Sequence, residues 1–445
     1  SIETADLKAL MIASAADETH IHESAQVRTA GPAMVATFYT GLLEKIGLRA
    51  RLLYRSEYKT AAQSVTEREM TPAHRESATR VIDVIRERAI TVIASNRALP
   101  PERIRGWLAR GLMTPREAVR EGVAAGTTSY DAIRRTIAAR GLRLSPPAAW
   151  LEQPAGFSPA PAIALVHVEG TIVNGQGGMP RIPFGETAAG ADEVVRALAQ
   201  AGSDPAVKGV IVRVQSGGGD VLASERMRAA LVEVARRKPT AVSFGDIAAS
   251  GGYYLACGDG SVRLPVFVKA ATLTGSIGVI TGKLVSRDLR ASLGITHQRI
   301  GDTNANLYGD EEDFTPAQLA LVTKILDYWY DEFKGAVARG RRLDRAVVET
   351  HARGRVWAGA DALVRGLADH EGGIHEALQW VAARAGLAWD ACALIEVNPE
   401  PAGLMRLVSG GSALDLSALT DADAWPGLFF SGRALALHPW SLRVE

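Results

Sequence analysis

The sequence is most informative between Thr240 and Cys257, where it reads TAVSFGDIAASGGYYLAC. The run Thr240–Phe244 predicts a short buried strand, and the run Tyr253–Cys257 predicts the first turns of an apolar helix. Ser250 then lies at or near the N-terminus of that helix. Unpaired backbone N–H groups and the positive end of the helix dipole favour negative charge at such a position.

Ser250 has two interpretations. Serine is a favoured N-cap residue and Ser-Gly-Gly is a common loop sequence, so a structural role is the simpler one. A nucleophile also suits this corner, because Gly251 and Gly252 leave room for a substrate backbone. A second glycine cluster, Gly217–Gly219, follows the predicted strand Val210–Val214 and favours catalysis, since its backbone N–H groups could bind the same oxyanion. A phosphate cradle is disfavoured, because no Gly-Lys-Ser/Thr follows.

Four motifs in a specific order resemble the signal peptide peptidase A (protease IV) family of Ser-Lys peptidases. They are Asp204–Val212, Ser216–Gly219, Ala249–Tyr254 and Thr272–Val279. The resemblance implies a Clp-protease/crotonase-like α/β fold built of repeated ββα units. It also implies a serine peptidase that needs no cofactor or metal and cleaves hydrophobic peptides such as remnant signal peptides. One position departs from the family pattern, because Gly217 stands where the family usually has proline.

An internal repeat indicates the long, two-domain type of the family. Thr71–Ala73 recurs as Thr315–Ala317, an offset of 316 − 72 = 244, and Leu112–Gly122 matches Val356–Gly366 at the same offset. A period this long indicates two homologous domains rather than a solenoid. We therefore predict a first domain at residues 1–142, a Pro-rich linker at 143–161, a second domain at 162–388 and a tail of unknown role at 389–445.

The two copies differ at the positions expected to be catalytic. An offset of 243 places Leu7 opposite Ser250, and an offset of 247 places Lys59 opposite Asn306. The first copy therefore lacks the serine nucleophile, and the second copy lacks the lysine. Lys59 also lies in Arg55–Ala61, which resembles the lysine motif in the first domain of long family members. A lysine acts as a base only when burial or nearby positive charge lowers its pKa. We predict that Lys59 is the general base; the alternative is a solvated surface lysine.

The expected mechanism is acyl transfer by a Ser-Lys dyad. Lys59 takes the Ser250 proton, and backbone N–H groups of the two glycine corners stabilise the oxyanion. The expected oxyanion residues are Gly218, Gly219 and Gly251. The resemblance further implies that Ser276 orients the lysine.

Two rival functions use the same fold. One is a crotonase-like acyl-CoA lyase or hydratase, which has similar oxyanion corners but carboxylate bases. The other is a non-catalytic assembly scaffold descended from the peptidase. Replacement of Ser250 by alanine distinguishes them from a peptidase, because only the peptidase would lose turnover.

Composition sets further limits. The chain has 445 residues, 47% hydrophobic and 22% charged, which is ordinary for a globular protein of two or three domains. Its net charge of +1 shows no excess of basic residues of the kind that indicates nucleic-acid binding. The two cysteines, Cys257 and Cys392, form no disulfide framework, and we predict that both are buried.

Membrane association and assembly are expectations from the resemblance. The apolar runs are shorter than the roughly 20 residues needed to cross a bilayer. The repeat predicts that about eighty residues of the first domain precede Ser1 in a longer protein, with any membrane anchor among them. The resemblance implies a homotetramer held at the bacterial inner membrane, on its periplasmic side, through a segment absent from this chain.

Overall fold

The computed structural model describes residues 2–128, 130–141, 161–177, 187–296, 298, 304, 307–397 and 435–436. It is a mixed α/β structure with three sheets, as predicted. Its described residues form two compact units. Unit 1 contains those up to Val35 and from Ile82 to residue 141. Unit 2 contains Ala36–Val81 and those from residue 161 onward.

Unit 2 is built around an eight-stranded sheet whose main path is β15-β13-β11-β9-β6-β17. The central strands β6 (Ala162–Glu169), β9 (Val207–Ser216) and β11 (Thr240–Ala249) are parallel. Their near-continuous apolar runs are typical of parallel strands that are buried on both faces. The shorter strands are β12 (Val266–Val268), β13 (Leu273–Gly275), β15 (Val356–Ala358), β16 (His370–Glu371) and β17 (Ala393–Glu396).

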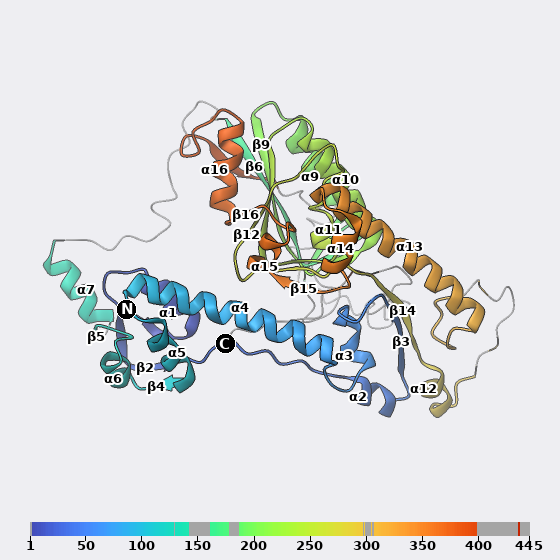
Figure 1. Cartoon of the computed structure of the whole chain (residues 1–445), viewed down its shortest axis with the longest axis horizontal. Coiled ribbons are helices and arrows are strands. Elements are labelled where there is room, and N and C mark those ends of the chain that lie inside the picture. The colour runs from blue at the N-terminus through green and yellow to red at the C-terminus, as the bar shows by residue number, and fades with distance from the viewer. Residues whose placement is uncertain are drawn as a thin grey trace, which may run out of the picture. The chain divides into compact units, whose positions relative to one another are not determined.

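Helices cover both faces of this sheet (Figure 1). Helices α9 (Ala191–Ser203) and α10 (Val221–Ala235) pack over the larger apolar core. Helix α16 (Ile374–Arg384) covers the opposite face, where Ile163, Ile211 and Val381 share a smaller core. The other helices of the second repeat copy are α11 (Gly251–Tyr254), α12 (Arg287–Ser292), α13 (Pro316–Arg341), α14 (Arg345–His351) and α15 (Gly359–Val364).

A six-stranded sheet, ordered β3-β14-β18-β10-β7-β8, also belongs to unit 2. Strand β3 (Arg49–Tyr54) pairs antiparallel with β14 (Ile280–Val285), so the segment that precedes Lys59 joins the sheet by main-chain pairing. Strand β18 (Leu435–Ala436) lies antiparallel between β14 and β10 (Gly219–Asp220). The remaining elements are β7 (Thr171–Val173), β8 (Ala188–Gly190), α2 (Thr40–Lys45), the 3-10 helix η1 (Thr60–Ala62) and α3 (Gln63–Thr66).

Unit 1 contains a four-stranded sheet with its own core. Its central strand β2 (His20–Arg28) pairs with β1 (Ile2–Ala5), β4 (Leu112–Met113) and β5 (Gly126–Thr127). Fully buried apolar side chains such as Ile21, Ile90 and Ile104 fill this core. The helices are α1 (Leu7–Ser14), α5 (Pro101–Arg110), α6 (Pro115–Arg120), α7 (Tyr130–Ala139) and the second half of α4 (Pro72–Arg97).

The order of elements repeats with the offset seen in the sequence. Helices α4 and α13 both have 26 residues and begin at Pro72 and Pro316, an offset of 316 − 72 = 244. At the same offset, α6 corresponds to α15, and β4 and β5 correspond to β15 and β16. The two copies of the repeat therefore have the same arrangement of elements in this region, in agreement with a tandem α/β fold.

The compact units do not coincide with the repeat copies. Residues 36–81 belong to the first copy by sequence but pack within unit 2, because β3 pairs with β14. The predicted linker 143–161 lies outside the described residues except for Pro161, and so does Asn306. Of the predicted tail, residues 389–397 and 435–436 are described, and each part contributes a strand to a sheet of unit 2.

Two local predictions differ from the structure. The helix after Ser250 is a single turn, α11, which ends at Tyr254. Further along, the Asp259 carboxylate accepts hydrogen bonds from the N–H groups of Ser261 and Val262. Cys257 is buried, but Cys392 is only partly buried, since it lies just before β17 at the edge of the sheet. No helix in the described part of the chain is long and apolar enough to span a membrane.

Candidate active site

Ser250 lies at the sharp corner between β11 and α11. Its backbone has φ 54° and ψ −116°, a left-handed conformation that is unfavourable for a residue with a side chain. The corner is held because the Ser250 N–H donates a hydrogen bond of 2.8 Å to the carbonyl oxygen of Gly275. None of the Ser250 surface is exposed. The serine is thus fixed at the end of a central strand, with its hydroxyl turned into the protein.

Lys59 meets Ser250 inside unit 2. Its Nζ lies 2.7 Å from the Ser250 Oγ, although 191 positions separate the two residues. Lys59 lies between β3 and η1, and the pairing of β3 with β14 places it close to Ser250. The side chain is fully buried, which disagrees with the alternative of a solvated surface lysine.

Ser276 completes the surroundings of the lysine nitrogen. The Nζ of Lys59 donates to the Ser276 Oγ and to the Ser276 carbonyl oxygen, each at 3.0 Å. Ser276 follows β13, the strand beside β11, so it lies next to Ser250 through the sheet register. Gly278, in the same motif, is a site residue that the sequence reasoning did not single out: a Cβ there would lie 3.2 Å from the Lys59 Cδ.

Burial lowers the pKa of Lys59 from 10.5 to about 7. The physical cause is the loss of water around the ammonium group, which disfavours the charged form. A neutral amine has two N–H donors and one lone pair. If both N–H groups donate to Ser276, the lone pair remains to accept the hydroxyl proton of Ser250.

The two glycine corners meet beside Ser250. A Cβ on Gly251 would lie 2.5 Å from the Ser224 Oγ and 3.1 Å from the backbone nitrogen of Gly219, so no side chain fits there. Gly251 is the first residue of α11, and the N–H groups of a first helical turn have no partner within the helix. The N–H of Gly218 donates to the Ser216 Oγ at 3.1 Å. Gly251 is therefore better placed than Gly218 to bind an oxyanion, through its N–H group rather than the dipole of a one-turn helix. Gly219 lies in β10, where it pairs with Ala436 of β18.

The other reactive side chains nearby have structural partners. The Tyr253 hydroxyl donates to the Leu367 carbonyl at 2.9 Å, and the Tyr254 hydroxyl donates to Glu225 at 2.7 Å. Burial raises the pKa of the Cys257 thiol to about 12, which makes it a poor nucleophile. Within the described residues, no group of His, Cys, Asp and Glu side chains could hold a metal ion.

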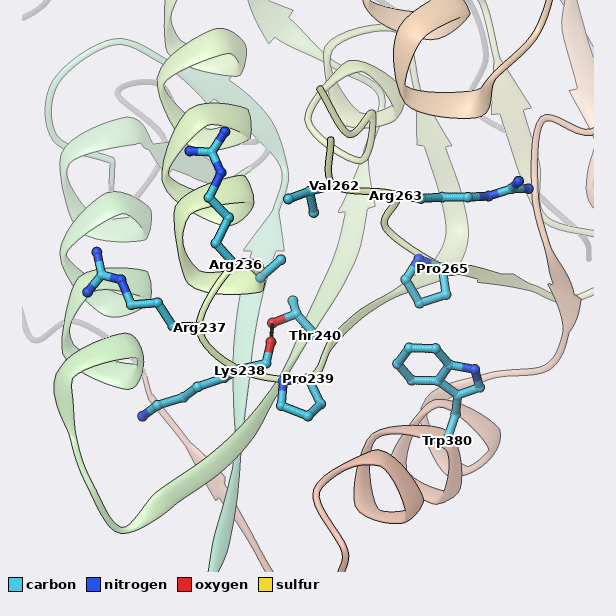
Figure 2. Close-up of a pocket in the computed structure, with 10 residues that line it drawn as sticks. Arg236, Arg237, Lys238, Pro239, Thr240, Val262, Arg263, Pro265 and Trp380 are labelled. Atoms are coloured by element: carbon cyan, nitrogen blue, oxygen red, sulfur yellow. Dashed lines mark hydrogen bonds between the residues drawn. The ribbon is translucent and has the colours of Figure 1, made fainter. Parts of the chain in front are cut away.

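A basic hollow of about 300 Å³ elsewhere in unit 2 has no features of an anion site. It is lined by Arg236, Arg237, Lys238, Arg263 and Trp380, among others. Figure 2 shows that the charged ends of these side chains spread outward rather than converge. Each already has a partner: Arg236 and Arg237 bind Glu233, Lys238 binds the carbonyl oxygens of Ala201 and Asp204, and Arg263 binds Asp369.

The chain belongs to peptidase family S49. The family model described as "Peptidase family S49" matches residues 4–142 and 233–388, which together form more than half of the chain. The matched segments contain Lys59, Ser250 and Ser276 and fall on both copies of the repeat.

Curated relatives carry protease names. Protease 4 of Haemophilus influenzae is 28% identical over 388 residues, which cover 82% of this chain and 61% of that protein. The chloroplastic serine protease SPPA of Arabidopsis thaliana is 26% identical over 92% of this chain and 61% of its own length. Protease 4 of Salmonella typhi is 26% identical over 84% of this chain and 62% of its own length. The chain thus spans about three fifths of the length of these relatives.

A solved structure of a ClpP1 mutant from Listeria monocytogenes also matches. It aligns with a TM-score of 0.30 and 13% identity, over 48% of this chain and 93% of that one. This similarity is too low to add to the topology described above.

Proposed function

We propose that this protein is a serine endopeptidase in which Ser250 is the nucleophile and Lys59 is the general base. The observation that carries the proposal is the 2.7 Å contact between the Lys59 Nζ and the Ser250 Oγ, with both residues fully buried. The lowered pKa of Lys59, about 7, supports it, because a base must be neutral near the working pH. Membership of a peptidase family points to the same reaction class.

Acylation requires one proton transfer and one bond formation. Neutral Lys59 removes the hydroxyl proton of Ser250 while the Oγ attacks the carbonyl carbon of the scissile peptide bond. The electron pair of the carbonyl moves to its oxygen, where the N–H groups of Gly219 and Gly251 donate hydrogen bonds. Such donors typically contribute about 3 to 4 kcal/mol each to transition-state stabilisation.

The tetrahedral intermediate then collapses. The C–N bond breaks as the Lys59 ammonium gives its proton to the leaving amine, and an ester on Ser250 remains. Neutral Lys59 next removes a proton from a water molecule that attacks the ester. Release of the carboxylic acid product restores Ser250 and Lys59 to their starting protonation states. Ser276 keeps the amine aimed at the serine throughout, through its two contacts with the Nζ.

Extended apolar peptides are the substrate class that we propose, with remnant signal peptides as an example. Val221, Leu222 and Ala223, which follow the glycine corner Gly217–Gly219, are aliphatic. Leu222 is more than half exposed, which makes apolar surface available next to β10. Such a surface favours apolar over charged side chains.

The test is the turnover of a fluorogenic apolar peptide by the parent and by Ser250→Ala and Lys59→Ala variants. We expect both to lose about 10³-fold or more in kcat, as removal of a nucleophile or general base does. Matched controls are Ser261→Ala and Lys208→Ala, which change exposed residues of the same types in the same unit. Full peptide hydrolysis by Ser250→Ala would mean that another group is the nucleophile. A crotonase-like reaction would instead be favoured if the parent left the peptide uncleaved and turned over an acyl-CoA with or without Ser250. Activity of Lys59→Ala alone would mean that another group is the base.

Assembly and location are proposed on the resemblance alone. We propose a homotetramer, and attachment to the periplasmic side of the bacterial inner membrane. Light scattering of the purified chain tests the first proposal. Fractionation of cells that express the protein tests the second, and recovery in the soluble cytoplasmic fraction would contradict it.

A further inference from the structure

The loop Arg353–Arg355, between α14 and β15, lies against the backbone of Lys59. A Cβ on Gly354 would lie 2.5 Å from the Cβ of Lys59 and 2.6 Å from its Cα and its backbone nitrogen. Gly354 also has φ +74°, which favours glycine. These distances leave no space for a side chain, so the loop backbone sets how deeply Lys59 enters the site.

The same loop is bonded to the residues that bind the lysine nitrogen. The Gly354 N–H donates to the carbonyl oxygen of Ile277 at 2.8 Å, and the Ser276 N–H donates to the carbonyl oxygen of Arg355 at 2.7 Å. The loop therefore contacts both ends of Lys59: its backbone directly, and its Nζ through Ser276.

The two arginines of the loop hold the residues that precede Lys59. Arg353 forms an ion pair with Glu57. Arg355 binds Glu76 at 2.7 Å, and Glu76 accepts a hydrogen bond of 2.8 Å from the Tyr58 hydroxyl.

The Arg355 guanidinium also contacts two aromatic rings. It is 4.7 Å from the ring centroid of Tyr58 and 4.5 Å from that of Trp357. Cation–π contacts of this kind add to the ion pair, and only a planar cation can stack in this way.

We propose that the loop Arg353–Arg355 is the positioning element of the general base, which holds Lys59 and Ser276 in register with Ser250. The inference rests on the proposed peptidase function and deepens it, because it names residues that act on the reaction without touching the substrate. Precise placement matters here, since a misplacement of about 1 Å can reduce a rate about 100-fold. Gly354, Arg355 and Glu76 are the positioning residues.

The test compares two glycine-to-alanine substitutions at positions with nearly the same positive φ, so the backbone strain that alanine introduces is the same in both. Gly354→Ala introduces a methyl group against Lys59, whereas Gly386→Ala introduces one at φ +71° with nothing within 4 Å. We expect Gly354→Ala to lower kcat about 100-fold with KM within about twofold, and Gly386→Ala to leave both near the parent values. Equal effects of the two substitutions on kcat, in folded proteins, would overturn the proposal.

Two milder variants cover the case in which Gly354→Ala does not fold. Arg355→Lys keeps the charge but loses the planar group that stacks on the aromatic rings, and Glu76→Gln removes the charge of its partner. We expect both to lower kcat about tenfold without a matching rise in KM, and to shift the acid limb of the pH–rate profile upward as Lys59 gains access to water. Parent values of kcat and an unchanged profile in both would overturn the proposal. Activity of Lys59→Ala would instead refute the dyad itself, so the two failures are distinguishable.

Discussion

Ser250 and Ser276 share an unusual backbone conformation and a common partner. Their φ angles are 54° and 52°, and their hydroxyl oxygens lie 2.7 Å and 3.0 Å from the same Lys59 nitrogen. Each such conformation costs on the order of 1–3 kcal/mol and persists only where the surroundings hold it. Ser250 follows β11 and Ser276 follows the neighbouring strand β13, so the pairing of these strands places both hydroxyl groups next to the Lys59 amine.

The first prediction concerns pH. Because burial lowers the pKa of Lys59 to about 7, the amine is protonated and inactive as a base below that pH. We expect kcat/KM for an apolar peptide to rise with pH through an apparent pKa near 7 and then to level off. The Lys208→Ala variant, which changes an exposed lysine, should give the same profile. A flat profile between pH 6 and pH 9 would contradict Lys59 as the base.

The second prediction concerns stability. The folded-state pKa of Lys59 is about 7 and its ordinary value is 10.5, so below pH 7 both the folded and the unfolded chain hold the proton. The folded state then bears the full cost of burying the charge, and this cost declines as the pH rises from 7 to above 10.5. We expect Lys59→Met to raise the free energy of unfolding by a few kcal/mol at pH 6.

The gain from Lys59→Met should shrink as the pH rises through that window. Chemical denaturation at several pH values measures it, with Lys208→Met as the control because Lys208 is exposed. A pH-independent gain would mean that the substitution acts through packing rather than through the proton.

The third prediction concerns the oxyanion corner. Gly251→Ala places a methyl group 2.5 Å from the Ser224 Oγ and 3.1 Å from the Gly219 nitrogen, where an oxyanion would bind. We expect kcat to fall by about 10²- to 10³-fold, the usual effect of losing one oxyanion donor, with a smaller change in KM. Combining it with Ser224→Ala relieves the closest contact but not the one at Gly219, so activity should stay low. Full recovery in the double variant would place the oxyanion donors elsewhere.

The fourth prediction concerns strand β18. Leu435 and Ala436 pair with Asp220 and Gly219 of β10, and Gly219 is itself an expected oxyanion donor. A peptide that adds to this edge of β10 must first displace β18. We expect removal of residues 398–445 to lower KM for an extended peptide several-fold without reducing kcat. Leu435→Pro, which disrupts strand pairing, should act in the same direction. An unchanged or higher KM in both variants, with folding intact, would show that β18 does not compete with substrate.

The long periodic elements of the fold were predictable from sequence. Helix α4 spans Pro72–Arg97, and its sequence indicates it, because proline after Thr71 starts a helix and the apolar spacing sustains it. The central strands followed from their apolar runs, as in β9 and β11. Strands of three residues or fewer, such as β13 and β15, carry too little periodicity to be recognised.

Within the site, residue identity was more predictable than placement. Comparing the two repeat copies singled out Lys59 and Ser250, which the structure brings together. The pairing of β3 with β14 was not predictable, since a strand does not specify a partner more than two hundred positions away. The loop Arg353–Arg355 was missed for the same reason: Gly354 matters only because Lys59 packs against it.

The sequence distance between the proposed catalytic groups has a consequence for biosynthesis. Lys59 precedes Ser250 by 191 positions and Ser276 by 217. At roughly 5–20 residues per second, a ribosome needs about 10–40 s to progress from Lys59 to Ser276. A nascent chain therefore carries the proposed base long before the proposed nucleophile, and the loop Arg353–Arg355 emerges later still. On the proposed mechanism, a growing polypeptide that lacks these later segments has no complete dyad and cannot hydrolyse peptides.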